Sequence, residues 1–289
     1  MSEKIKTVVI TGPTATGKTA LAVKLARLYP AEIVSVDSRQ VYRGMDIGTG
    51  KDLDEYGLVP HHLIDIAEPN DFFSMHDFQR LARFVRDAYR AIREIAARGR
   101  IPILCGGTAL YLAALLDGYR LPGGALPPRK KGVERVRQNP DHEQSFEPPF
   151  ELDALILGVY YPRGEVHARI EARLDSRLTD GLVDEVRKLH EVNGVTWEQL
   201  EFFGLEYREA ARYLKGECTL LEMRNTLLCR IRQFAKRQDI FFRKLEGHDF
   251  YWLKAGREPD PCGLLEQFLK DEPLPPPALR LCDINYGRK

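Results

Sequence analysis

An eight-residue segment near the N-terminus has the residue types and spacing needed to bind phosphate. Residues 12–19 match the pattern GxxxxGK[ST] in full. Glycines in such a loop let backbone N–H groups turn inward on phosphate oxygens, and the N-terminus of a following helix adds partial positive charge. Lys18 is placed to neutralise a terminal phosphate, and the Thr19 hydroxyl is placed to hold Mg²⁺. The pattern predicts a phosphate-rich ligand without specifying ATP. The predicted phosphate-binding residues are Gly12, Pro13, Thr14, Ala15, Thr16, Gly17, Lys18 and Thr19.

An aspartate that closes an apolar run is the second candidate for chemistry. Asp37 directly follows the run at residues 33–36. Many nucleotide hydrolases place a metal-binding carboxylate after another strand, but here the run at 101–105 is followed by Gly-Gly-Thr. Asp37 could hold a metal, act as a base on an acceptor, or cap a turn. This arrangement is typical of small-molecule kinases and other group-transfer enzymes.

These residues need strands and helices to position them, and the apolar pattern predicts both. A β-branched run at 7–10 leads into the phosphate-binding segment, and a helix is expected at 18–29. Further strands are expected at 101–105 and 154–160 as well as 33–36, with helices at 78–97, 165–192, 205–214 and 220–244 and one ending near 116. Strands that alternate with helices predict a parallel sheet. The expected fold class is α/β: a P-loop NTPase-like parallel sheet flanked by helices, with a helical C-terminal half and a reduced insertion.

Composition excludes several classes of protein. The chain has 289 residues, 44% of them apolar, which is enough to bury a sizeable core. Its 43 basic and 42 acidic residues give a formal net charge of +1, so a surface that binds nucleic acid must be local. Neither a membrane span nor a secretory leader is predicted, and five scattered cysteines indicate neither disulfides nor a zinc site. We expect a cytoplasmic protein without a membrane partner, and a monomer.

Proline and glycine suggest how the chain is divided. Residues 1–120 are expected to form the P-loop α/β core. Residues 121–150 are rich in proline with basic residues between, and are expected to form a shortened insertion or linker. Residues 151–270 should hold the remaining core strand and the C-terminal helices, and residues 271–289 should form a tail.

Motifs beyond the phosphate-binding segment carry a resemblance to a known family. Three of them read SVDSRQVYRGMDIGT at 35–49, PHHLID at 60–65 and GGTALY at 106–111. C-terminal segments at 169–173, 181–186, 207–209 and 232–238 add to this co-linear set. The set closely resembles the tRNA dimethylallyltransferase family of P-loop isopentenyltransferases. The resemblance covers most of residues 5–120 and 155–245.

The resemblance implies a prenyl transfer from dimethylallyl diphosphate to N6 of an adenosine next to the anticodon in tRNA. The phosphate-binding segment would then hold a diphosphate leaving group together with Mg²⁺. Asp37 would be the base that takes a proton from the amine, and Thr108 would touch the bridging oxygen of the diphosphate. Arg169 and Arg173 would be candidates to contact the diphosphate. The implied acceptor-contacting residues are Asp37, Ser38, Arg39 and Gln40.

A basic stripe on the expected helix 220–244 is the candidate surface for RNA. Seven basic residues lie between 224 and 244, and within that segment only Asp239 opposes them. Helical spacing places some of them on one face, opposite an apolar face, which suits a phosphate backbone. Resemblance at residues 236–238 favours tRNA over a merely solvated face. The predicted tRNA-contacting residues here are Arg232, Lys236, Arg237 and Gln238.

Several alternatives remain open at the level of sequence. Residues 121–150 lack the longer helical insertion with which the family embraces the anticodon stem, so the acceptor could instead be AMP, ADP or ATP, as in adenylate isopentenyltransferases. A P-loop small-molecule kinase and a non-catalytic RNA-binding protein are the other candidates. Thr108 could be only a helix N-cap, Arg169 and Arg173 could form salt bridges along their own helix, and His61-His62 is better explained as structural than as a metal site.

Overall fold

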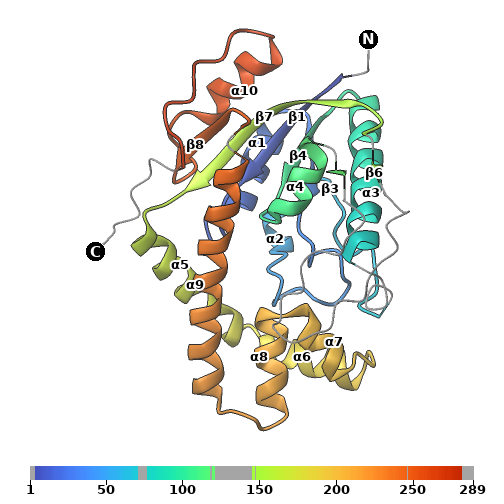
Figure 1. Cartoon of the computed structure of the whole chain (residues 1–289), viewed down its shortest axis with the longest axis vertical. Helices are drawn as coiled ribbons and strands as arrows, with labels where there is room; N and C mark the ends of the chain where they lie inside the picture. Colours follow the sequence, from blue (N-terminus) through green and yellow to red (C-terminus); the bar gives the residue numbers. More distant parts are fainter. Residues whose placement is uncertain are drawn as a thin grey trace.

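Six parallel strands form the centre of the molecule (Figure 1). The structure is a computed structural model that describes residues 4–70, 77–117, 119–120, 145–146, 148–245 and 247–281. The strand order is β3-β2-β4-β1-β7-β8, and every neighbouring pair is parallel. The prediction of an α/β fold with a parallel sheet is confirmed. The strands are β1 (Lys4–Thr11), β2 (Ala31–Ser35), β3 (His61–His62), β4 (Ile101–Cys105), β7 (Glu151–Tyr160) and β8 (Phe250–Lys254).

Alternating side chains of the central strand feed two separate cores. Val8 and Ile10 of β1 point to the face covered by α1 (Lys18–Leu28) and α10 (Pro261–Leu269). Val9 points to the opposite face, which packs against α3 (Asp77–Ala97) and α4 (Ala109–Leu116). Because both faces of the strand are buried, it reads as a continuous apolar run, as expected of a parallel sheet between two helical layers.

The C-terminal helices lie below the sheet in Figure 1. They are α5 (Arg163–Thr179), α6 (Leu182–Glu191), α7 (Trp197–Phe203), α8 (Leu205–Leu214) and α9 (Leu220–Lys244). Helices α5 and α9 and the start of α6 form a third apolar cluster, and the rest of α6, α7 and α8 join the core on the α3 side. Val166, Ile170 and Leu174 recur at helical spacing on α5 and pack with apolar residues of α9. Helix α9 runs from α8 up to the sheet, so one rigid element joins the helical part to the site.

One predicted helix is wrong: residues 165–192 form two helices. The chain breaks between α5 and α6 at Gly181, whose φ is 101°. This left-handed conformation suits glycine, which has no Cβ to clash. The apolar spacing continues on both sides of the break, which is why periodicity alone predicted one helix.

Short elements complete the described chain. They are α2 (Leu53–Tyr56) and an antiparallel pair, β5 (Tyr119–Arg120) with β6 (Ser145–Phe146). The predicted insertion at 121–150 and the predicted tail at 271–289 lie largely or partly outside the described residues. No helix in the described part of the chain combines the length and apolar content needed to cross a membrane.

Candidate active site

Three loops meet at the carboxyl ends of neighbouring strands. The phosphate-binding loop at residues 12–17 follows β1, a second loop follows β2, and a Gly-Gly-Thr loop at 106–108 follows β4. The backbone N–H of Gly106 donates to the Ile10 carbonyl at 3.1 Å, and that of Thr108 donates to the Val36 carbonyl at 3.3 Å. A Cβ on Gly106 would collide with this same Val36 carbonyl. The three loops therefore form one backbone-linked edge, where ligands bind in open α/β sheets.

Lys18 lies inside the phosphate-binding loop. Its ammonium donates to the Pro13 carbonyl at 2.7 Å, and the Thr16 hydroxyl donates to the same oxygen at 2.9 Å. Burial lowers the pKa of Lys18 to about 8; Cys105 and Asp37 oppose that shift, and Arg173 adds to it. A partly desolvated ammonium without a full counter-charge gains strongly from an anionic ligand. The loop is thus built to accept phosphate.

Asp37 and Thr108 both act on the loop after β2. One carboxylate oxygen of Asp37 accepts from the N–H of Arg39 at 2.8 Å, so the turn-capping interpretation holds for that oxygen. The Thr108 hydroxyl oxygen accepts from the N–H of Ser38 at 3.1 Å. Although Thr108 is the N-cap residue of α4, its side chain makes no capping hydrogen bond. Thr108 therefore occupies the N-cap position, as that alternative expected, but its side chain connects two loops of the site.

The two candidate arginines point away from their own helix. Arg169 donates from Nε to the carbonyl of Ala15 in the phosphate-binding loop at 2.7 Å. Arg173 pairs with Asp52 at 2.7 Å and lies 3.5 Å from the Gly50 carbonyl. Among the described residues neither pairs with an acidic residue of α5, so the helix salt-bridge alternative is wrong. Arg169 is the arginine that touches the phosphate-binding loop.

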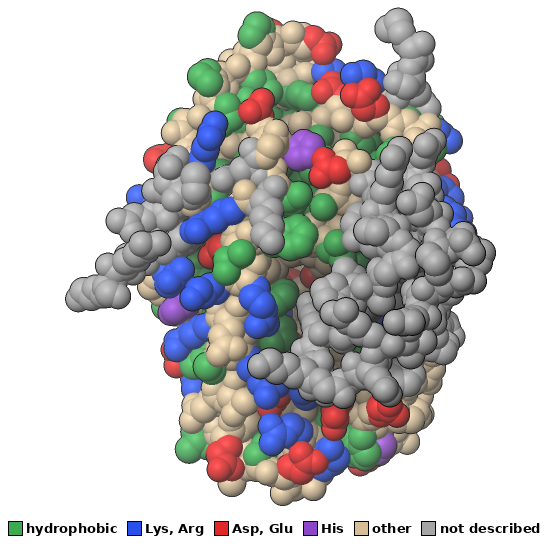
Figure 2. All heavy atoms as spheres, viewed as in Figure 1, with side chains coloured by type: hydrophobic (Ala, Val, Ile, Leu, Met, Phe, Trp, Pro, Cys, Tyr) green, Lys and Arg blue, Asp and Glu red, His purple; other side chains and the backbone are tan. Residues whose placement is uncertain are grey.

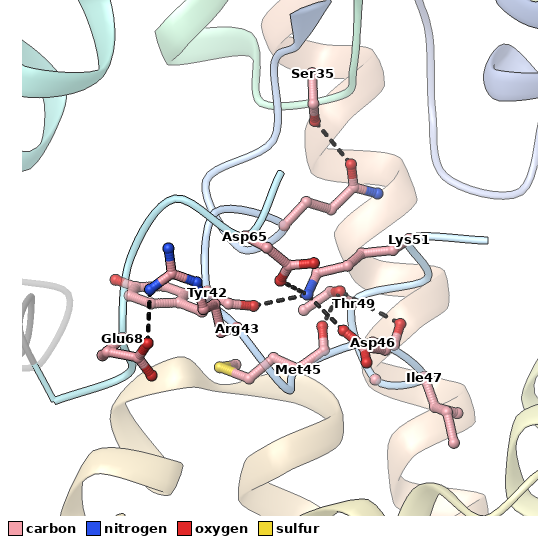
Figure 3. A network of polar contacts seen from close by, with 12 residues as sticks. Ser35, Tyr42, Arg43, Met45, Asp46, Ile47, Thr49, Lys51, Asp65 and Glu68 are labelled. Carbon is pink, nitrogen blue, oxygen red and sulfur yellow. Dashed lines mark hydrogen bonds and ion pairs between the residues drawn. The ribbon is translucent and has the colours of Figure 1, made fainter. Parts of the chain in front are cut away.

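A buried lysine holds the segment that follows Asp37 (Figure 3). The Lys51 side chain is only 1% exposed, and its ammonium donates to the Tyr42 carbonyl at 2.7 Å. It also pairs with the carboxylates of Asp46, at 2.5 Å, and Asp65. Asp65 comes from a different stretch of chain. This single cation therefore connects residues 38–50, which we call the acceptor loop after its predicted role, to the segment around residue 65. Sequence spacing gave no signal for this role.

Gln40 and Glu185 fix the acceptor loop at two further points. The Gln40 side chain accepts from the Ser35 hydroxyl at 2.7 Å and donates to the Gly50 carbonyl at 3.0 Å. Glu185 of α6 accepts from three successive backbone N–H groups at residues 46–48, at 2.7 to 3.1 Å, and from the Tyr207 hydroxyl at 2.8 Å. A carboxylate held by several donors anchors the loop to the helical part.

Arg39 lies against aromatic rings of α7. Its guanidinium carbon is 5.5 Å from the Phe202 ring centre and 5.7 Å from that of Phe203. Burial lowers the pKa of Arg39, although the guanidinium stays protonated at any physiological pH. The residue predicted to contact an acceptor is therefore also packed into the protein.

The basic stripe on α9 is narrower than predicted. Arg232 pairs with Glu171 of α5 at 2.9 Å, Arg224 pairs with the same glutamate, and Arg230 pairs with the buried Glu209. The acidic partners come from other helices, so the charge sum within one segment overstated the positive charge that α9 presents to solvent. Lys236 and Arg237 are exposed. Figure 2 shows Lys and Arg side chains gathered on the face where α9 runs.

Two other sequence interpretations have clear structural outcomes. His62 contacts the buried Glu32 at 2.6 Å, in agreement with a structural role. Gln238, predicted to contact tRNA, is buried and reaches two loops of the phosphate site instead. Cys105, which the sequence did not single out, lies beside Lys18, and burial raises the pKa of its thiol to about 12. That thiol stays neutral and is no nucleophile at physiological pH.

Thr19 and Asp37 carry oxygen donors of the kind that Mg²⁺ binds. Thr19 stands in the first turn of α1, and Asp37 begins the loop after β2. Among the described residues, no group of three or more His, Cys, Asp or Glu side chains is arranged to hold a metal. Mg²⁺ needs no such cage, because it keeps several waters and usually binds one or two protein oxygens together with substrate phosphates.

A phosphate-binding loop after the central strand, with a carboxylate and a threonine beside it, defines a P-loop group-transfer enzyme. A family model described as IPP transferase matches residues 40–148 and 130–245, and one described as Isopentenyl transferase matches residues 5–57. The chain belongs to the IPP transferase family.

Curated relatives and a solved structure agree with this assignment. The chain is 41% identical to tRNA dimethylallyltransferase 2 of Trichlorobacter lovleyi over 86% of its own length and 92% of the relative's. It is 44% identical to tRNA dimethylallyltransferase 1 of Geotalea uraniireducens over 87% and 93%. The full-length tRNA isopentenylpyrophosphate transferase of Bacillus halodurans superposes with a TM-score of 0.68 at 30% identity, over 86% of this chain and 90% of that one.

Proposed function

We propose that this enzyme transfers a dimethylallyl group from dimethylallyl diphosphate to N6 of an adenosine next to the anticodon in tRNA. The observation that carries the proposal is the convergence of Lys18, Asp37 and Thr108 from three loops joined by hydrogen bonds. The relatives that match most of the chain are tRNA dimethylallyltransferases, and the exposed basic residues of α9 supply a surface for RNA. The reaction belongs in the cytoplasm, where tRNA is available.

The chemistry follows from the charges that change during transfer. The allylic C–O bond of the donor breaks, diphosphate leaves with the bonding electrons, and N6 forms the new C–N bond. Lys18, the loop N–H groups and Arg169 counter the negative charge on the leaving group, with Thr108 beside its bridging oxygen. Asp37 takes the proton that N6 loses. Mg²⁺ held by Thr19 would supply further charge to the diphosphate.

A transfer assay with competing acceptors tests this function. Purified enzyme, Mg²⁺ and radiolabelled dimethylallyl diphosphate are offered unmodified tRNA in one reaction and AMP, ADP and ATP in another. Label in tRNA is expected. Label only in nucleotides would assign the enzyme to the adenylate branch, and phosphorylation of an acceptor by ATP would make it a kinase.

The role of Asp37 is tested in the same assay with two variants. Asp37→Asn keeps an oxygen that can accept from the Arg39 N–H, so the turn should survive while the base is lost. Turnover should fall at least about 10²-fold. Asp37→Ala removes both the base and the oxygen that accepts from the Arg39 N–H, so the turnover of this variant should fall at least as far. Binding of tRNA should persist in Asp37→Asn, and near-normal turnover in that variant would remove Asp37 from the mechanism.

A further inference from the structure

Gln238 connects α9 to two loops of the phosphate site. The residue is 7% exposed and belongs to the helix that also carries Lys236 and Arg237. Its side-chain oxygen accepts from the backbone N–H of Thr14 at 2.9 Å, and its side-chain nitrogen donates to the Gly107 carbonyl at 2.9 Å. Both the donor and the acceptor of the amide are thus used. An amide carries its donor and its acceptor on separate atoms, so it can serve both loops at once.

The connection extends into the acceptor loop. Gly107 is followed by Thr108, whose hydroxyl oxygen accepts from the Ser38 N–H at 3.1 Å. On the other side, the Thr11 hydroxyl donates to the Gly106 carbonyl at 2.9 Å. Hydrogen bonds of Gln238 and Thr108, joined by the backbone between Gly107 and Thr108, therefore connect the phosphate-binding loop to the residue that follows Asp37.

The packing around Gly107 shows how closely Gln238 fits. A Cβ on Gly107 would lie 2.7 Å from the Gln238 side-chain nitrogen, whereas the Gly12 carbonyl oxygen at 3.4 Å and the Cε atom of Lys18 at 3.7 Å would be at ordinary contact distance. Gly107 is not among the glycines with a positive φ, so alanine would not strain the backbone there. The main effect of Gly107→Ala would be to displace the amide of Gln238. The contact between Gly107 and Gln238 can thus be disturbed by substituting either residue.

We propose that Gln238 is a positioning residue that holds the phosphate-binding loop against the Gly-Gly-Thr loop and thereby shapes the diphosphate site. It is not a contact for tRNA, although its neighbours Lys236 and Arg237 face solvent. The inference rests on the proposed function for the identity of the diphosphate ligand. It predicts that disturbing Gln238 weakens diphosphate binding and leaves tRNA binding unchanged.

Binding of inorganic diphosphate with Mg²⁺, measured by calorimetry, is the first test because it does not depend on turnover. Gln238→Ala should raise the dissociation constant about tenfold, the change expected for one lost hydrogen-bonded position. Gln238→Glu should raise it further, because a carboxylate faces both the Gly107 carbonyl and the ligand. Exposed Gln233 on the same helix provides the control, Gln233→Ala, which should bind normally. The KM for dimethylallyl diphosphate should follow these constants, while the dissociation constant for tRNA stays constant.

A double-mutant cycle with Gly107→Ala separates positioning from general destabilisation. If the alanine acts through Gln238, it weakens diphosphate binding in the wild type but adds little in the Gln238→Ala background. This cycle also serves if Gln238→Glu fails to fold. Weakened tRNA binding with unchanged diphosphate binding in Gln238→Ala, or strict additivity in the cycle, would overturn the inference. If the wild type transfers no label to any acceptor yet the diphosphate results hold, the proposed function fails and the role of Gln238 stands.

Discussion

At the scale of a single residue, the lowered pKa of Lys18 predicts how catalysis depends on pH. Burial lowers the pKa of its ammonium to about 8, so a fraction of the free enzyme loses this charge just above neutrality. A neutral amine no longer counters the charge of a diphosphate. Bound diphosphate acts in the opposite direction, because a nearby anion favours the protonated form and raises the pKa.

We therefore expect kcat/KM for dimethylallyl diphosphate to fall as pH rises past about 8. The corresponding fall in kcat, which reports the complex, should lie at higher pH. Initial rates between about pH 6.5 and 9.5 measure the fall in kcat/KM and the fall in kcat. Lys18→Arg is the matched control, because a guanidinium stays charged over this range. The substitution should abolish the fall in kcat/KM at high pH, whatever its effect on the maximal rate. A kcat/KM profile that stays flat in the wild type would contradict this assignment.

At the scale of elements, the acceptor loop is held by the core and by α6 in addition to its own hydrogen bonds, such as that from Gln40 to the Gly50 carbonyl. Lys51 and Glu185 supply the two charged anchors, one on each side. A loop fixed in this way presents Ser38 to Gln40 in one arrangement before any ligand binds. Such preorganisation contributes to rate because the reacting groups need not be ordered during the reaction.

Replacing Lys51 with methionine tests whether the loop needs its buried cation. Asp46 and Asp65 remain 51% and 36% exposed, so water can partly replace the lost partner, and a destabilisation of about 1–3 kcal/mol is expected. Thermal unfolding measures this cost. The KM for tRNA should rise while diphosphate binding stays normal. Lys4→Met, which removes an exposed pair with Glu151, should change neither quantity. Unchanged tRNA kinetics in Lys51→Met would show that the loop keeps its shape without the lysine.

Local patterns in the sequence were sufficient for the elements and loops but not for the contacts between distant segments. The positions of β1, β2, β4 and β7 and the phosphate-binding loop follow from short apolar runs and one motif. The two edge strands were missed: β3 is only two residues long, and β8 is a five-residue run that pairs with β7 alone among the described strands. Gln238 was assigned to RNA because its neighbours in sequence are basic, whereas its hydrogen-bond partners lie at 14 and 107. Arg232 was likewise assigned without its ion-pair partner Glu171.

At the scale of the whole molecule, a nearly neutral chain must recognise a highly charged RNA through a local surface. The formal net charge is +1, and several arginines of α9 are already paired with acidic residues of other helices. The exposed cations that remain on this helix near the site include Lys236 and Arg237. They lie two residues and one residue before Gln238, so the proposed RNA surface and the proposed support of the diphosphate site share one stretch of helix.

Reversing both charges, in Lys236→Glu/Arg237→Glu, should therefore weaken tRNA binding and make its dependence on salt shallower. If each side chain neutralises one phosphate, the slope of log K against log salt should decrease in magnitude by about two. Dissociation constants for tRNA between about 50 and 300 mM salt measure that slope. Lys24→Glu/Lys270→Glu changes the net charge equally on exposed residues of α1 and just beyond α10. Equal losses in both double variants would mean that tRNA responds to overall charge, whereas a loss confined to α9 locates the RNA on that helix, next to the loops that carry out the transfer.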